Sequence, residues 1–156
     1  MTSKPTAFNA IQLEVLWTRL ISIVDEAAKA IVRTAFSTLS NEANDFACVL
    51  TDACGRSLAQ NSGSIPSFIA TLPATVRHFL DHIGAENMRP GDILVTNDPW
   101  KGTGHLPDVC IVQPIFRGDH LVAFAATTSH VPDIGGRIRA LEAREIYEEG
   151  LQIPLM

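Results

Sequence analysis

The sequence lacks the features that mark secreted and membrane proteins. Only 6% of its 156 residues are aromatic and 19% are charged. No window reaches the roughly 20 consecutive apolar residues that a membrane-spanning helix needs. The first ten residues, MTSKPTAFNA, have no apolar core of the length found in signal peptides. These absences predict a cytoplasmic protein without a membrane span.

Positive charge is also scarce. The formal net charge is −5, and the 12 lysines and arginines are scattered along the chain. Proteins that bind nucleic acid gather basic residues to neutralise phosphates, so nucleic acid is excluded as a partner. The G-x-x-x-x-G-K-[ST] pattern of phosphate-binding loops is missing too. A nucleotide used by this protein is therefore expected to bind elsewhere.

Cysteine occurs only three times, at Cys48, Cys54 and Cys110, and never as a C-x-x-C pair. An odd number of unpaired cysteines fits the reduced thiols of a cytosolic protein better than a disulfide framework. We expect all three to be buried as small apolar side chains.

The chain does contain clear helix signals. From Ile11 to Phe36, apolar residues recur at steps of three and four, which predicts one long amphipathic helix. Its apolar positions are Leu13, Leu16, Trp17, Leu20, Val24, Ala28, Ile31 and Ala35. A second helix is expected from about Pro73 to Ile83, with Gly84 in the usual stop position. A third is expected from Leu141 to Glu149, ended by Gly150.

Strand signals lie between these helices. The expected strands are 46–51, 57–59, 93–96, 109–116 and 121–128. Turn residues at 52–55 join the first two as a hairpin, and the tight turn RGDH at 117–120 joins the last two. The pattern predicts one α+β domain, in which a long N-terminal helix packs on a largely antiparallel sheet built from hairpins.

Two histidines, His78 and His82, lie four residues apart on the second predicted helix. This spacing can place two imidazoles on one helix face as metal ligands. However, the acid that accompanies them in the H-E-x-x-H motif is missing. We therefore interpret both as solvent-facing or capping side chains.

The second hairpin brings two polar loops together, NDPWKGTGHLPD before its first strand and SHVPDIGG after its second. Facing residues of an antiparallel pair have numbers with a constant sum, and a turn at Gly118 and Asp119 sets that sum near 237 or 238. With a strict two-residue turn, Asp108 and His130 lie one position apart on opposite faces. A three-residue turn makes them direct partners. The sequence leaves both alternatives open.

His105 is a third candidate at the same end of the hairpin. It precedes Asp108 by three residues, and Pro107 fixes the backbone between them. His105, Asp108 and His130 therefore form a possible two-histidine, one-carboxylate set for Zn, Mn or Fe, with positions left open for water or substrate. The alternative is a purely structural hydrogen-bonded cluster. Asp98 and Asp133 are candidates for orienting the ligand histidines or accepting a proton.

Several motifs resemble the hydantoinase B/oxoprolinase family. They are NDPWKGTGHLPDVCIVQPIF, SHVPDIGG and EIYEEGLQIP, preceded in family order by NDFACVLTDACGRSLAQ and IPSFIATLPATVRHFL. The resemblance covers nearly the whole chain. Three features depart from the family pattern: Trp100 in place of a frequent tyrosine, GTGH in place of GGTH, and Val131 in place of a second histidine. The last leaves one possible ligand fewer.

The resemblance implies a chemistry that spacing alone does not. Family members include subunits of ATP-dependent hydantoinases and 5-oxoprolinases, whose A-type partner subunit uses the ATP, and related ketone carboxylases. In the acetone carboxylase branch a His-x-x-Asp pair and a later histidine hold a divalent metal, and this pattern maps onto His105, Asp108 and His130. The implied function is the opening of a cyclic amide, with a metal-activated water attacking an amide that the partner activates.

Two alternatives accompany this implied function, namely a ketone carboxylase subunit and an inactive, truncated remnant that only binds a partner. Family subunits are several times longer than this chain. We therefore expect residues 1–156 to be the N-terminal part of a hydantoinase B/oxoprolinase domain, truncated at Met156 and inactive alone.

Overall fold

The structure, a computed structural model, describes residues 8–137 and 143–156. The helices are α1 (Ala10–Thr34), α2 (Thr38–Asn41) and α3 (Pro66–Ile83). The strands are β1 (Phe46–Asp52), β2 (Ser57–Gln60), β3 (Leu94–Thr96), β4 (Asp108–Arg117) and β5 (His120–His130). Two short 3₁₀ turns, Ala85–Asn87 and Ile146–Glu149, complete the described elements.

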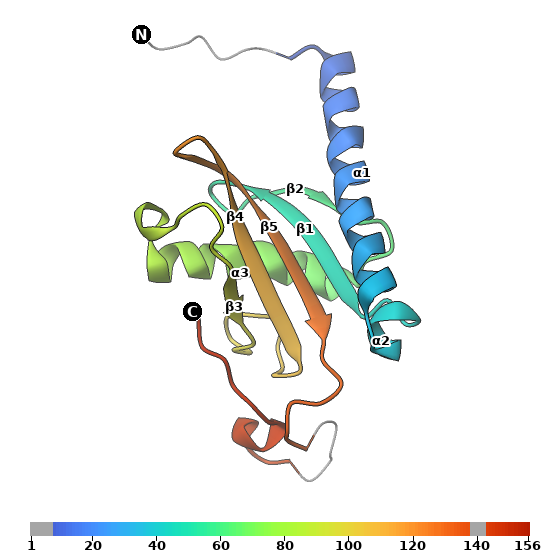
Figure 1. The fold of residues 1–156 in the computed structure, drawn as a ribbon, viewed down its shortest axis with the longest axis vertical. Helices are drawn as coiled ribbons and strands as arrows, with labels where there is room; N and C mark the ends of the chain where they lie inside the picture. Colours follow the sequence, from blue (N-terminus) through green and yellow to red (C-terminus); the bar gives the residue numbers. More distant parts are fainter. Residues whose placement is uncertain (1–7, 138–142) are drawn as a thin grey trace.

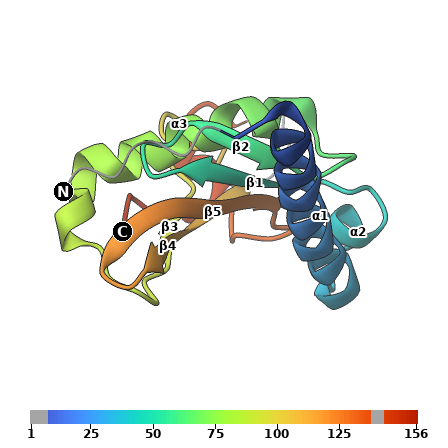
Figure 2. The same cartoon turned by 90° about the horizontal axis from the view of Figure 1, so that it is seen from above.

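The strands form one open sheet in the order β2-β1-β5-β4-β3, and every neighbouring pair is antiparallel. Helix α3 covers one face of the sheet, whereas α1 lies against the other face beside β1 and β2 (Figures 1 and 2). The predicted α+β class and the predicted hairpins are confirmed. No helix within residues 8–137 and 143–156 is long and apolar enough to cross a bilayer.

The main core lies between α3 and the sheet. Alternate residues of the strands point toward α3, as the two-residue period of a strand requires. This core contains Ala47, Val49, Phe68, Leu72, Val76, Phe79, Met88, Leu94, Cys110, Val112, Phe124 and Ala126. The even-numbered residues of β4 and of the second half of β5 therefore face α3, which fixes the face on which Asp108 and His130 project.

Helix α1 begins where the sequence predicts, because Asn9 and Gln12 form a reciprocal capping box. Only Val24 and Ala28 on this helix are buried, against Phe46, Cys48 and Ala59 of the sheet. The first half of the predicted apolar face is uncovered, and Trp17 is 59% exposed. We call residues 11–17 with Ile23 the uncovered half-helix.

Three expectations about local structure are wrong, and the first concerns the start of the second predicted helix. Helix α3 begins at Pro66, and Pro73 lies inside it. Pro66 occupies the first turn, where its missing N–H costs nothing. The roughly two helical turns gained before Pro73 bury Phe68 and Leu72 in the core, which offsets the backbone hydrogen bond that an interior proline removes.

The predicted helix from Leu141 to Glu149 is not an α-helix over its described part. Leu141 lies outside the described residues, and residues 143–149 contain only the 3₁₀ turn. Here the backbone bonds to the preceding loop instead, through a bridge between Gly135 and Gly150 and from Arg137 N to Glu148 O. Cys54 is also exposed rather than buried, because it lies in the turn after β1.

Candidate metal centre

The register of β4 and β5 answers the question that the sequence leaves open. The turn contains only Gly118 and Asp119, so Arg117 faces His120 and Phe116 faces Leu121. The register then shifts, and Ile115 faces Ala123, which leaves Val122 without a partner. This one-residue bulge raises the constant sum from 237 to 238. Asp108 and His130 are consequently direct partners.

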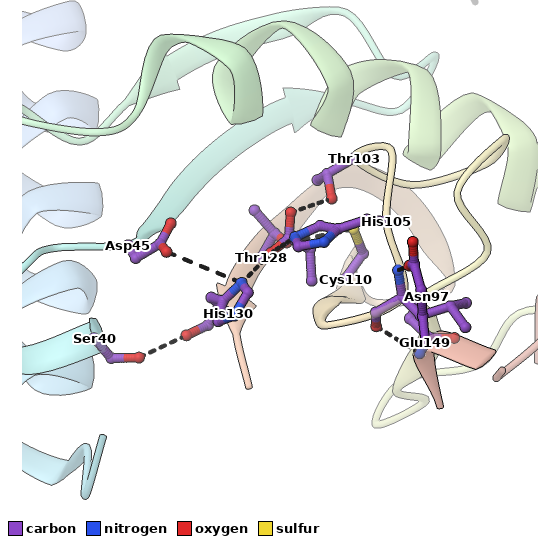
Figure 3. A network of polar contacts seen from close by, with 12 residues as sticks. Ser40, Asp45, Asn97, Thr103, His105, Cys110, Thr128, His130 and Glu149 are labelled. Carbon is purple, nitrogen blue, oxygen red and sulfur yellow. Dashed lines mark hydrogen bonds and ion pairs between the residues drawn. The ribbon is translucent and has the colours of Figure 1, made fainter. Parts of the chain in front are cut away.

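The three predicted ligands meet at the end of this hairpin. The Nδ1 atom of His130 lies 3.0 Å from Asp108 Oδ1, and the Nε2 atom of His105 lies 3.2 Å from the same oxygen. The two imidazole rings have centroids 5.2 Å apart. Potential ligand atoms of all three residues lie within 4.8 Å of one another. Figure 3 shows His105 and His130 side by side, with their rings turned toward the same point.

Burial differs across the cluster. The side chains of Asp108 and His130 are each 4% exposed, whereas that of His105 is 37% exposed. A small molecule would therefore approach from the His105 side. Neither His78, which is half-buried, nor His82, which is exposed, belongs to a group of potential ligands in the described part of the chain.

A tight turn sets the position of His105. Asp108 N donates to His105 O across Pro107, at 3.3 Å. Leu106 is fully buried between the two ligands and anchors the turn. Val131 N donates to Pro107 O at 2.8 Å, which ties the turn to the residue after His130. Both ligand-bearing segments are thus held by backbone bonds that do not involve the ligand side chains.

Thr103 orients the carboxylate of Asp108. Its hydroxyl donates to Asp108 Oδ2 at 2.7 Å. The other oxygen, Oδ1, is left facing both imidazoles. Sequence reasoning missed this residue, because nothing in the GTGH segment indicates which way the threonine hydroxyl points.

Asn97 was also missed, and it connects the site loop to the end of the chain. Its side-chain amide donates to Leu106 O at 2.7 Å and to Leu151 O at 2.8 Å, and its oxygen accepts from Ile153 N. The residue is 1% exposed. Because Leu151 and Ile153 follow Asn97 by more than fifty residues, only the fold reveals these bonds.

The two predicted orienting acids are bound to turn amides instead of histidines. Asp98 Oδ1 accepts from Trp100 N at 2.9 Å, and Asp133 Oδ1 accepts from Gly135 N at 2.8 Å. Asp98 is half-buried and Asp133 is exposed. Both lie on the loops that flank the cluster, so they remain candidates for accepting a proton from a bound substrate or water.

Cys110 lies on the same face of β4 as Asp108 but is an inert neighbour. It is fully buried, and burial raises the pKa of its thiol to about 11, partly opposed by contact with the Thr128 hydroxyl. The thiol is therefore neutral at physiological pH. Cys110 does not belong to the group of potential ligand atoms formed by His105, Asp108 and His130, so the donor set here is two imidazoles and one carboxylate.

This donor set fits a divalent metal ion. Ligands about 2.1 Å from a common ion lie roughly 3.0–3.4 Å apart when they occupy adjacent positions. The two contacts to Asp108 Oδ1, at 3.0 and 3.2 Å, already match that spacing. Three protein ligands also leave positions open on the ion, as catalytic sites require. Imidazole with carboxylate suits Zn, Mn or Fe.

A cavity opens beside the cluster. Its volume is about 720 Å³, and its lining includes Gly104, which precedes His105, together with Trp100, Tyr147 and Glu149. Trp100 and Tyr147 are 72% and 75% exposed. This volume lies in the range of small-molecule sites, and the cavity is next to the cluster rather than lined by it.

An open antiparallel sheet with this ligand set and cavity at one end defines a candidate metalloenzyme segment. Comparison of the sequence with known families then assigns it: the profile of the hydantoinase B/oxoprolinase family matches residues 9–156. The chain belongs to that family.

Individual relatives agree with this assignment. The chain is 34% identical to 5-oxoprolinase 1 of Arabidopsis thaliana over 148 residues, which are 93% of this chain and 12% of that protein. It is 31% identical to a putative B-type subunit of a D-/L-hydantoinase from Pseudomonas sp. (strain NS671), over 92% of this chain and 25% of that one. The chain thus spans a quarter or less of the length of these relatives.

A solved structure shares the fold. The ATP-dependent caprolactamase of Pseudomonas jessenii superposes with a TM-score of 0.79 at 27% sequence identity, over 97% of this chain and 26% of that chain. The open sheet with α3 on one face is therefore a fold that this chain shares with that solved structure.

Proposed function

We propose that this chain supplies the metal centre of an ATP-dependent enzyme that opens cyclic amides such as hydantoin or 5-oxoproline. The observation that carries the proposal is the cluster of His105, Asp108 and His130, in which Asp108 and His130 are buried, beside an open cavity. Membership of the hydantoinase B/oxoprolinase family supplies the reaction class. Relatives and neighbours named 5-oxoprolinase, hydantoinase and caprolactamase share a lactam or cyclic imide bond as the point of attack.

Each residue of the proposed centre and of the cavity has its own role in this reaction. His105 and His130 bind through neutral imidazole nitrogen, and Asp108 binds through Oδ1, whose direction Thr103 fixes. If these residues held a divalent Zn, Mn or Fe ion, the site would gain a water-derived nucleophile at neutral pH, because such ions lower the pKa of bound water toward about 7. Asp98 or Asp133 accepts the proton released during attack. Trp100 and Tyr147 give the ring of the substrate an apolar wall.

In this proposal ATP is bound and used by a partner subunit. Amide resonance makes a ring carbonyl a poor electrophile, so transfer of the γ-phosphate of ATP to the amide oxygen, with release of ADP, activates the carbon for attack. Water adds to that carbon, the ring C–N bond breaks as the nitrogen takes up a proton, and the phosphate is then released from the new carboxyl group by hydrolysis. A hydantoinase A/oxoprolinase-type subunit performs the phosphate transfer, and the present chain presents the nucleophile. One relative is named as the B-type subunit of a hydantoinase, which supports assembly with such a subunit. We place the complex in the cytoplasm, where ATP and reduced thiols are found.

Metal binding is the first test. The chain is stripped with a chelator and then supplied with Zn²⁺, Mn²⁺ or Fe²⁺, and bound metal is measured after desalting by elemental analysis. One ion per chain is expected for the wild type, and none for His105→Ala. Wild-type protein that retains no ion would overturn the proposed centre.

Turnover is the second test. The chain, in its complex with an A-type subunit, is assayed for ATP hydrolysis stimulated by 5-oxoproline, hydantoin or acetone. Stimulation by a cyclic amide supports the proposal, and Asp98→Asn or Asp133→Asn should lower it while leaving metal content unchanged. Stimulation by acetone alone would instead indicate a ketone carboxylase, and partner binding without metal or turnover would indicate an inactive remnant.

A further inference from the structure

A second cavity lies on the face of the sheet that α1 covers, opposite the face on which His130 projects. Its volume is about 440 Å³, and it is enclosed by the second half of α1, the start of β1 and the loop 61–63 that follows β2. Figure 1 shows this end of α1 beside the start of β1. Phe46 lines the cavity, and the preceding Asp45 accepts a backbone bond from His130 N at 3.1 Å. The cavity and the ligand cluster therefore lie at the same end of the sheet, on opposite faces.

Two cations line this cavity without a partner for their charge. Lys29 and Arg33 are four residues apart and are therefore neighbours on one side of α1. Like charges at this spacing destabilise a helix. No ion pair to either side chain is found within residues 8–137 and 143–156. The repulsion between the two cations is thus not offset by any carboxylate in the described part of the chain.

The acid best placed to pair with Lys29 is held by a loop instead. Asp25 precedes Lys29 by four residues on α1, which is the spacing that favours an ion pair. Its Oδ1 atom accepts from Ser62 N at 2.7 Å, and its Oδ2 atom accepts from the Ser62 hydroxyl at 3.2 Å. Both carboxylate oxygens are engaged by the loop that closes the cavity. With two cations and this one acid, the lining has one positive charge in excess.

Neutral groups complete a lining that suits an anion. Asn61 lines the cavity and is 4% exposed. Its side-chain oxygen accepts from Cys48 N at 2.8 Å, which orients the amide, and its nitrogen makes one long bond, to Ser62 O at 3.4 Å. An amide nitrogen carries two hydrogens, so one remains for a ligand. Val32 and Phe46 add an apolar wall.

We propose that this cavity is a second binding site, for a small organic anion. Lys29 and Arg33 bind its carboxylate or phosphate group, since ammonium and guanidinium groups form their strongest hydrogen bonds with these anions. Val32 and Phe46 contact the apolar part of the molecule. A cavity of 440 Å³ lies in the range of small-molecule sites. The inference is independent of the metal centre proposed above, because none of the three proposed metal ligands lines this cavity.

Amide NMR spectra of the ¹⁵N-labelled 156-residue chain test the site. Phenyl phosphate, benzoate and the neutral benzamide are titrated in separate samples, with a chelator present so that no probe binds through a metal. We expect both anions to shift the backbone amide signals of Ser62 and Gly63 and the side-chain amide signals of Asn61. Benzamide should leave these signals in place. The anion with the lower Kd identifies the charged group that the site prefers.

Lys29→Gln and Arg33→Gln remove one charge each from exposed side chains, so buried packing is kept. Each variant is expected to weaken binding of the preferred anion about three- to tenfold, and the double variant should not bind it. The unfolding midpoint without ligand should not fall, because each substitution also removes the repulsion between the two cations.

Arg19→Gln is the matched control. It removes a charge from an exposed side chain of the same helix, outside the cavity. Ten residues, or roughly 15 Å along the helix axis, separate Arg19 from Lys29. Wild-type affinity is expected for this variant.

Three outcomes would overturn the proposal. The absence of shifts with both anions would show that the cavity does not bind this class of molecule. Binding of benzamide as tight as that of benzoate would show that the charge is not recognised. Equal weakening by Arg19→Gln and Arg33→Gln would assign the binding to the general surface charge of α1.

Discussion

Asp108 and His130 face each other across β4 and β5, although the two-residue turn that joins these strands would place them one position apart. The bulge at the unpaired Val122 makes the two-residue turn compatible with the direct pairing of Asp108 and His130. The core fixes the second half of β5, since Phe124 and Ala126 must face α3. The two-residue turn at Gly118 and Asp119 fixes the register of the first half of β5. The bulge absorbs the one-residue difference between them, and the register that the core imposes brings the two proposed ligands, Asp108 and His130, opposite each other.

Deletion of Val122 tests this account. Without Val122 the pairing of Phe116 with Leu121 continues directly into the pairing of Ile115 with Ala123, so the two-residue turn and the pairing of Asp108 with His130 are both kept. The free energy of unfolding, measured by urea denaturation, should change by less than about 0.5 kcal/mol, and metal affinity should stay near that of the wild type. Loss of metal binding without loss of stability would show that the bulge, not the core, sets the register.

Metal binding should stabilise the fold through the ligand cluster. At a free metal concentration one hundred times the Kd, a single-site ligand adds about 2.7 kcal/mol. For a chain of this size that corresponds to a rise in Tm of roughly 5–10 °C. Differential scanning calorimetry with and without Zn²⁺ should show this rise for the wild type and none for His105→Ala. An equal rise in both proteins would place the ion elsewhere.

Asn97→Ala should destabilise the protein while leaving every ligand side chain present. The substitution leaves the buried carbonyl of Leu106, the part-buried carbonyl of Leu151 and the part-buried N–H of Ile153 without their hydrogen-bond partner. We expect a loss of about 2–4 kcal/mol in the free energy of unfolding, measured by chemical denaturation. Asn97→Asp keeps the acceptor but turns a buried carboxylate oxygen toward the carbonyl oxygens of Leu106 and Leu151, so it should destabilise the protein at least as much as Asn97→Ala. A loss below about 0.5 kcal/mol would contradict the role assigned to this side chain.

The three cysteines should react very differently with iodoacetamide. Cys54 is exposed, whereas Cys48 and Cys110 are buried. Burial also raises the pKa of both buried thiols, that of Cys110 to about 11, so at neutral pH each stays protonated and weakly nucleophilic. Mass spectrometry of the native protein should find Cys54 modified alone, and all three after denaturation. Rapid native modification of Cys110 would show that β4 opens.

Local spacing predicted the part of the site that a hairpin brings together. Asp108 and His130 are joined by one tight turn, and His105 is three residues from Asp108, so their meeting follows from short-range geometry. The parity of their register did not follow, because the bulge depends on how Phe124 packs against α3.

The remaining contacts of the site join residues that are far apart in the sequence, so the sequence did not predict them. Asp45 reaches His130 only because β1 pairs with β5, and Asn97 meets Ile153 only because the end of the chain returns to β3. Neither pairing leaves a signal in the spacing of the residues. The start of α3 was wrongly predicted at Pro73 for a related reason. The burial of Phe68, which depends on tertiary packing, outweighs the local cost of an interior proline.

The uncovered half-helix of α1 has a practical consequence. Its apolar residues lie at the end of α1 farthest from the strand ends that carry the ligands (Figure 1). Contacts between molecules through Leu16 and Trp17 would obey mass action and grow with protein concentration, whereas occupancy of the ligand cluster depends on the ion alone. Titrations repeated over a range of dilutions would separate self-association from chelation within a single purified sample.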